Sequence, residues 1–216
     1  KGFSQLKIAL SVGIQKMARS DLASSGIIFT LDTETGFPNV VLINSVYGLG
    51  ELIVKGKITP DEFYVFKPTL RQAQGKLLRQ AQGKLYKPII IKNLGRKTKK
   101  YIYKKEGGLK EVKVPQKQQS RFSLRDDEIL KLAQWACLIE EHYKTPQDIE
   151  WAKDGKTGQL FIIQSRPETV EAQKKERVYE EYKIETKRKP ILDGTAIGNK
   201  IVEGKVKIIT DASKIG

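Results

Sequence analysis

Four polar side chains, placed two and two on either side of a turn, are the residues of this sequence best suited to chemistry. Asp148 and Glu150 lie in one run of alternating residues, and Gln164 and Arg166 lie in a second run. The segment 154–158, Asp-Gly-Lys-Thr-Gly, separates the runs and predicts a β-hairpin. Because side chains alternate across a strand, the two members of each pair lie on one face of their strand.

If the two polar faces coincide, the hairpin presents carboxylates, an amide carbonyl and a fixed cation together. Mg²⁺ prefers oxygen ligands from one or two carboxylates plus substrate phosphates, and a planar guanidinium pairs with phosphate oxygens. Ile163 and Ser165 would then lie on the opposite face, and Pro167 would end the strand. The pattern suits a metal–nucleotide triphosphate. An ordinary cross-strand ion pair explains the same residues, and the spacing alone leaves both interpretations open.

The composition predicts a folded domain without disulfides. The chain has 216 residues, of which 39% are hydrophobic, and a single cysteine, Cys137. No apolar run approaches the roughly 20 residues of a membrane span, so we expect no membrane partner and a cytoplasmic location.

The formal net charge of +15 raises the question of a nucleic-acid partner. The lysines between residues 87 and 117, Lys97 among them, are scattered and lack an interleaved aromatic platform of the kind that binds RNA. The sequence therefore favours a lysine-rich, solvated surface, and we expect no nucleic-acid partner.

Short strands separated by turn signals make up most of the predicted secondary structure. We expect strands at 7–17, 27–33, 40–48 and 61–68, a strand pair within 88–105, and a polar connection over 106–119. This order is not a βαβ alternation.

One clear helix is predicted between these strands and the hairpin. Ser123 is the expected N-cap, with Asp126 three residues on, and Pro146 is expected to end the helix. Cys137 is predicted to be a small core residue, and His142 a structural residue near the helix C-terminus. Apolar residues recur at spacings of three and four and predict one buried face: Ile129, Leu132, Ala136, Ile139 and Tyr143.

Three further segments mark the organisation of the chain. Residues 70–85 are a perfect tandem repeat of eight residues, Leu-Arg-Gln-Ala-Gln-Gly-Lys-Leu, which we interpret as an exposed insertion. Residues 171–189 are highly charged and predict a linker. The glycine-punctuated pattern from residue 190 to 216 indicates the beginning of another domain.

Several long motifs, in order, resemble the phosphoenolpyruvate synthase (pyruvate, water dikinase) family and the nucleotide-binding domain that it shares with pyruvate phosphate dikinase. They are VGIQKMARSDLASSGIIFTLDTETGF, INSVYGLGE, PDEFYVFKP, DIEWAKDG and LFIIQSRPETV. The resemblance implies an α+β fold: a partial ATP-grasp domain over 1–170, mostly antiparallel sheet with a flanking helix. It also implies that 190–216 is the truncated start of a β/β/α swivelling phosphohistidine domain.

The resemblance assigns roles to the four hairpin residues. Glu150 matches a metal-binding acid of the family, and Gln164 matches an amide on the metal and phosphate side. Arg166 matches the catalytic arginine that binds the terminal phosphates, and Asp148 matches a supporting acid. The implied cofactors are ATP and Mg²⁺.

The resemblance also implies where the rest of the nucleotide lies. Gln15 and Met17 match a segment that runs past the adenine, where backbone groups bond the base and the methionine packs on it. Glu51 matches an acid near the ribose. Without the resemblance, Gln15 and Met17 are equally well explained as the end of a strand.

The family reaction sets the expected partners. In that family ATP donates its β-phosphate to a histidine of the swivelling domain, AMP and phosphate are released, and pyruvate is phosphorylated at a separate C-terminal barrel. The intact family member is expected to be a homo-oligomer. The only histidine here, His142, lies upstream of the swivelling segment. The pyruvate barrel and the N-terminal lysine–arginine subdomain are not matched, so we expect the isolated chain to be inactive.

Three alternatives stay open at this point. One is another dikinase-like phosphotransferase, such as an antibiotic or glucan kinase built on the same domain. The second is a non-catalytic basic module that binds polyanions with a steep salt dependence. The third is a gene remnant that makes no stable protein.

Overall fold

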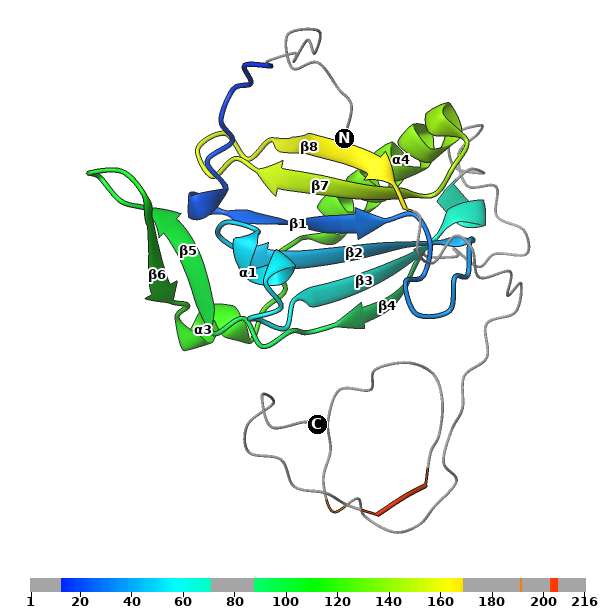
Figure 1. The fold of residues 1–216 in the computed structure, drawn as a ribbon, viewed down its shortest axis with the longest axis horizontal. Coiled ribbons are helices and arrows are strands. Elements are labelled where there is room, and N and C mark those ends of the chain that lie inside the picture. The colour runs from blue at the N-terminus through cyan, green and yellow to red at the C-terminus, as the bar shows by residue number, and fades with distance from the viewer. Residues whose placement is uncertain (1–12, 71–87, 169–190, 192–202, 206–216) are drawn as a thin grey trace, which may run out of the picture.

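The described part of the chain is a six-stranded antiparallel sheet with one long helix on one face (Figure 1). The computed structural model describes residues 13–70, 88–168, 191 and 203–205. The sheet order is β4-β3-β2-β1-β7-β8. Its strands are β1 (Ser24–Phe29), β2 (Val40–Tyr47), β3 (Asp61–Phe66), β4 (Ile89–Asn93), β7 (Gln147–Lys153) and β8 (Leu160–Pro167).

The remaining elements are short, apart from the helix that covers the sheet. β5 (Lys99–Tyr103) and β6 (Leu109–Lys113) form a separate two-stranded hairpin. The short helices are η2 (Ser20–Leu22), α1 (Glu51–Val54) and α3 (Gln116–Gln119), and the long one is α4 (Asp126–Tyr143). The expectation of a mostly antiparallel sheet with a flanking helix is confirmed.

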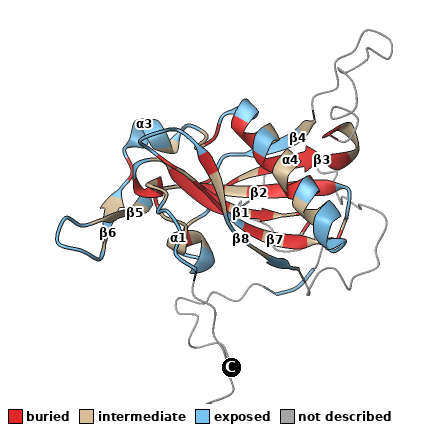
Figure 2. Ribbon diagram, turned by 90° about the horizontal axis from the view of Figure 1, so that it is seen from above, coloured by how far each residue is buried: buried red, intermediate tan, exposed pale blue. Residues whose placement is uncertain are grey.

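The hydrophobic core lies between α4 and one face of the sheet, where Figure 2 shows the buried residues gathered. Ile129, Leu132 and Ala136 of α4 are completely buried, as the spacing predicted. Cys137 is buried among them, as expected. On the sheet side, the cluster consists of alternate residues of several strands, including Ile28, Ile43, Phe63, Val65 and Ile149.

The other face of the sheet carries α1, which lies across the sheet from α4 (Figures 1 and 2). By alternation, this face mixes buried apolar residues of β2, such as Leu42 and Val46, with polar side chains. Ile27 of β1 pairs with Asn44 of β2 and with Glu150 of β7, so these three residues share that face. This is the face on which the hairpin residues of interest lie.

The helix begins later than the sequence predicted. Its N-cap is Arg125, whose backbone N–H donates to the Glu128 carboxylate over 3.0 Å, so Ser123 is not the cap. The Ser123 hydroxyl instead contacts Asp61 and Ser45, which holds it away from the helix. The helix ends at Tyr143, before Pro146, but Tyr143 itself is 56% exposed and does not belong to the buried face.

The predicted strand over 7–17 is wrong for the residues that the structure describes. Residues 13–17 have no regular structure, and Ile14 and Met17 are exposed. The apolar pattern suggested a strand, but no described strand pairs with this segment, and an extended segment without a partner leaves its backbone groups outside the sheet.

Two predictions for residues 88–119 are also corrected. The expected strand pair exists as β4 and β5, but β4 pairs with β3 and β5 pairs with β6. The polar connection over 106–119 contains β6 and the short helix α3. Leu109 and Val112 are three positions apart, which is not the spacing of two that marks a strand in a sequence.

Other predictions lie outside the described residues. These are the tandem repeat after Leu70, the linker and the start of the swivelling domain. Within the described ranges, no helix is both long and apolar enough to cross a membrane.

Close approach of three strands makes Gly26 of β1 essential to the sheet. A Cβ atom at this position would lie 1.8 Å from the Asn44 carbonyl oxygen and 3.0 Å from the Trp151 indole nitrogen. We predict that Gly26→Ala lowers the free energy of unfolding by about 3 kcal/mol, because strands β1 and β2 would have to separate. Gly13→Ala, where nothing lies within 4 Å of the added atom, is the control. Equal denaturation midpoints for the two variants would contradict this packing.

Candidate functional site

The β7–β8 hairpin brings the four predicted polar residues together on one face. Asp148 lies directly opposite Arg166, and Glu150 lies directly opposite Gln164. Directly opposite residues in an antiparallel pair point to the same side of the sheet. The coincidence of the two polar faces, on which the metal–phosphate interpretation depends, is therefore confirmed.

A β-bulge interrupts the hairpin next to this group. Glu150 pairs with Gln164, but Trp151 pairs with Ile162, so Ile163 is an extra residue on β8. The sequence placed Ile163 on the face opposite Gln164. In the structure it is partly exposed and lines the same cavity as Glu150, so that expectation is wrong. A bulge depends on how two strands meet, which simple alternation does not record.

Arg166 is held by Asp148 through two hydrogen bonds. Its Nε and Nη2 atoms donate to one carboxylate oxygen, Oδ2, over 2.8 and 2.7 Å. The Asp148 side chain is 13% exposed and the Arg166 side chain 68% exposed. Hydrogen bonding to Asp148 raises the pKa of Arg166, and the nearby Glu150 charge adds to this. The ordinary cross-strand ion pair is thus present, and it fixes the guanidinium beside Glu150.

Beside the hairpin lies a cavity of about 610 Å³, lined by residues from distant parts of the sequence. Four of the predicted site residues line it: Gln15, Met17, Glu51 and Glu150. Asp148, Gln164 and Arg166 are not in its lining, but they continue the polar row from Glu150 towards the edge of the sheet. The volume lies in the range of small-molecule and cofactor sites.

Glu51 sits in the first turn of α1 and already has a partner. Lys55 donates to its carboxylate over 2.8 Å, one turn later in the helix. Both side chains are half exposed, so the pair is of the kind that contributes little to stability.

Asp154, in the turn of the β7–β8 hairpin, connects this hairpin to the segment that carries Gln15 and Met17. Its Oδ2 atom accepts the backbone N–H of Arg19 over 2.9 Å, and its Oδ1 atom accepts the backbone N–H groups of Lys156 and Thr157, both over 2.8 Å. The bond from Arg19, followed by that from Thr157, lowers the pKa of Asp154 to about 2. The sequence predicted a turn here but not this link.

The donor atoms on the hairpin suit Mg²⁺ with a phosphate ligand. Glu150 offers a carboxylate and Gln164, directly opposite, an amide oxygen, and Mg²⁺ is often bound by one or two carboxylates plus substrate phosphates. Within the described ranges, no group of three or more His, Cys, Asp or Glu side chains is arranged to hold a metal ion. Glu150 and Gln164 could supply protein oxygen ligands to a metal whose other ligands are phosphate oxygens.

Sequence reasoning missed the β5–β6 hairpin as part of the cavity. Tyr103 of β5 and Leu109 of β6 lie opposite each other and both line it. The available signal was the motif Lys-Tyr-Ile-Tyr, an alternating aromatic run, but nothing in it says where the hairpin docks.

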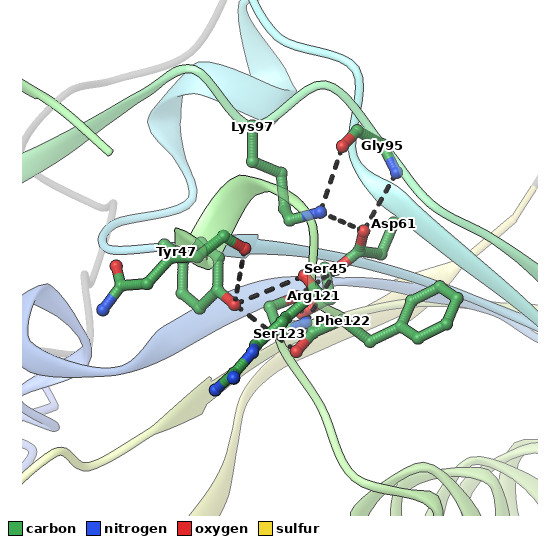
Figure 3. A network of polar contacts seen from close by, with 9 residues as sticks. Ser45, Tyr47, Asp61, Gly95, Lys97, Arg121, Phe122 and Ser123 are labelled. Carbon is green, nitrogen blue, oxygen red and sulfur yellow. Dashed lines mark hydrogen bonds and ion pairs between the residues drawn. The ribbon is translucent and has the colours of Figure 1, made fainter. Parts of the chain in front are cut away.

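The other missed feature is a buried polar network at the foot of the same hairpin. Lys97, which the sequence placed on a solvated surface, is completely buried and ion-paired with the equally buried Asp61. Figure 3 shows the Lys97 ammonium between the Asp61 carboxylate and the Gly95 carbonyl. The second oxygen of Asp61 accepts the Ser123 hydroxyl over 2.6 Å and its backbone N–H over 2.8 Å.

Comparison with known proteins agrees with a nucleotide-binding sheet of this kind. The chain matches the family model described as pyruvate phosphate dikinase, AMP/ATP-binding domain, over residues 1–186. The chain belongs to this family.

Several proteins similar to this chain share one enzyme name. A phosphoenolpyruvate synthase of Aquifex aeolicus is 50% identical over 97% of this chain and 24% of its own length. Phosphoenolpyruvate synthases of Synechocystis sp. and Escherichia coli K12 are each 46% identical, over 99% and 100% of this chain and 26% of their own length. The expected resemblance is confirmed, and the chain spans about a quarter of the length of these relatives.

The Asp154 link predicts a pH-dependent contribution to stability. The folded pKa of about 2 lies below the ordinary value of 3.8. The contribution is therefore complete above pH 3.8 and is lost as the pH falls towards 2. We expect Asp154→Asn to lower the free energy of unfolding. The gap in this free energy between wild type and variant should narrow as the pH falls from 3.8 towards 2.

Urea denaturation at a series of pH values measures this gap. Glu106→Gln, which changes an exposed carboxylate in the β5–β6 turn, is the matched control. Its free energy of unfolding should stay close to that of the wild type at every pH. A wild-type advantage that stays constant down to pH 2 would rule out the proposed linkage.

Proposed function

We propose that this chain is the Mg-ATP-holding part of a phosphoenolpyruvate synthase, an ATP-grasp domain over residues 1–170. The observation that carries the proposal is the register of the β7–β8 hairpin. It sets Glu150 against Gln164 and Asp148 against Arg166, beside a cavity that also reaches Gln15, Met17 and Glu51. Membership of an AMP/ATP-binding family and the names of the similar proteins support it.

Each side chain then has a separate part in holding the nucleotide. Glu150 and Gln164 would hold Mg²⁺ through their side-chain oxygens, and the ion would offset the charge of the phosphates. Arg166 donates to the terminal phosphates, and Asp148 keeps the Arg166 guanidinium in place. The Nε and Nη2 atoms of Arg166 donate to Asp148, and its Nη1 atom makes no hydrogen bond to any described residue.

The other end of the cavity is assigned to the nucleoside. Backbone groups of 15–17 bond the adenine edge, Met17 packs against the base, and Glu51 lies near the ribose. The exposure of Met17, 62%, accords with a side chain that a ligand covers. The partly apolar character of this end suits a base better than a phosphate.

The reaction follows from this arrangement within the whole enzyme. ATP is held so that its β-phosphate faces an incoming histidine, and phosphoryl transfer needs mainly positioning and charge neutralisation. Arg166 offsets the charge that develops as the phosphoryl groups separate. Residues 171–189 serve as a linker and 190–216 as the start of the histidine-bearing domain, and pyruvate is bound elsewhere in the enzyme.

We predict that Mg²⁺-dependent ATP binding requires Glu150 and Arg166. In calorimetric titration of the full chain with ATP and Mg²⁺, Glu150→Gln and Arg166→Ala should each raise Kd by about tenfold or more, because each removes a charged contact. The Glu150→Gln effect should shrink when Mg²⁺ is omitted, whereas the Arg166→Ala effect should persist.

Two exposed positions on other elements provide matched controls. Glu141→Gln near the end of α4 and Arg121→Ala before it make the same chemical changes and should leave Kd unchanged. If neither hairpin variant altered ATP binding, or if the longer enzyme with either change kept its ATP-dependent phosphorylation, the assignment would be wrong.

A further inference from the structure

The β5–β6 hairpin forms a wall of the cavity although it is not part of the main sheet. Tyr103 and Leu109 are paired across the hairpin and both line the cavity, facing a space that is bounded on other sides by β1 and the segment 15–18. Figure 1 shows the hairpin standing at the end of the sheet where β1 begins. An aromatic and an aliphatic side chain side by side make a flat, apolar surface.

Tyr103 lies at the end of the cavity that contains Met17. Both residues also line an adjoining hollow of about 380 Å³, whose lining does not include Glu150. The aromatic side chain is therefore close to Met17, in the segment assigned to the base.

The position of the Tyr103 ring is supported from outside the cavity. The Arg19 guanidinium lies 5.9 Å from the ring centroid, within the range of a cation–π contact. Arg19 is itself fixed by two hydrogen bonds to Asp21, of 2.8 and 2.9 Å. Its backbone N–H is bonded to Asp154, so the ring is tied to the hairpin that carries Glu150.

The foot of the hairpin is anchored to the main sheet. The Lys97–Asp61 ion pair joins the residues just before β5 to the first residue of β3. The Tyr101 carbonyl accepts the Leu49 N–H over 3.3 Å, and a Cβ atom on Gly48 would lie only 2.6 Å from that carbonyl oxygen. These contacts hold β5 against the chain between β2 and α1.

We propose that Tyr103 is a base-stacking residue of the nucleotide site and that the β5–β6 hairpin is a built wall of that site. The ligand group it recognises is the flat aromatic base of a nucleoside triphosphate, which packs between the Tyr103–Leu109 surface and Met17. This inference rests on the proposed nucleotide function and adds a residue and an element to it. The stacking contact depends on the ring face, not on the phenol hydroxyl.

The test separates the base from the phosphates. Kd is measured by calorimetry for Mg-ATP and for magnesium tripolyphosphate, which carries the phosphates alone, with the full chain and its variants. Tyr103→Ala and Tyr103→Leu should each weaken Mg-ATP binding about tenfold, as loss of base stacking does. Tyr103→Phe should bind Mg-ATP like the wild type, and none of the three should change the Kd for tripolyphosphate.

Tyr143→Ala, at an exposed tyrosine at the end of α4, is the control and should alter neither Kd. If Tyr103→Ala loses its cooperative unfolding transition, Tyr103→Leu, which keeps an apolar side chain in the wall, serves as the test variant. If the wild type binds ATP but both variants match it, the inference is overturned. It is also overturned if both ligands weaken together, since Tyr103 would then act through the fold. A wild type that binds neither ligand would refute the proposed function itself.

Discussion

The register between β7 and β8, continued into β1, is the constraint on which the rest of the site depends. Glu150 pairs with Gln164 on one side and with Ile27 on the other. A slip of one residue would turn each of these side chains to the face covered by α4. Ile149, which lies between Asp148 and Glu150, is completely buried in the core that includes α4. The hydrophobic core therefore enforces the register, and the register places the polar side chains on the open face.

Polar links then fix the pieces that surround the cavity. Asp154 ties the segment after Met17 to the β7–β8 hairpin, and the Lys97–Asp61 pair ties the β5–β6 hairpin to the sheet. Both use a carboxylate that accepts several donors, which is how a buried charge is tolerated. Strands β1, β7 and β8 of the cavity wall are paired in one sheet, and these polar links attach the remaining walls to it.

Part of this could be predicted from the sequence, and the reason for the limit is physical. Alternation fixed which hairpin residues share a face, and the helical spacing of Ile129, Leu132 and Ala136 located the core, because both patterns are local. Lys97 looked like one more surface lysine, since its burial depends on Asp61, which lies 36 residues earlier. The bulge at Ile163 and the docking of Tyr103 likewise depend on how distant segments meet. The segment 13–17 looked like a strand, but β structure requires a partner that its own sequence does not specify.

Substitution of Mn²⁺ for Mg²⁺ gives the most direct test of the central claim, that the open face of the β7–β8 hairpin holds the metal and the phosphates. In NMR spectra of the full chain with ATP, paramagnetic Mn²⁺ broadens the signals of nearby amides. We predict that ATP-dependent broadening centres on Glu150 and Gln164, extends to Arg166, and spares the far end of α4. Broadening centred on Glu140 and Glu141 at the end of α4, or broadening that does not depend on ATP, would contradict it.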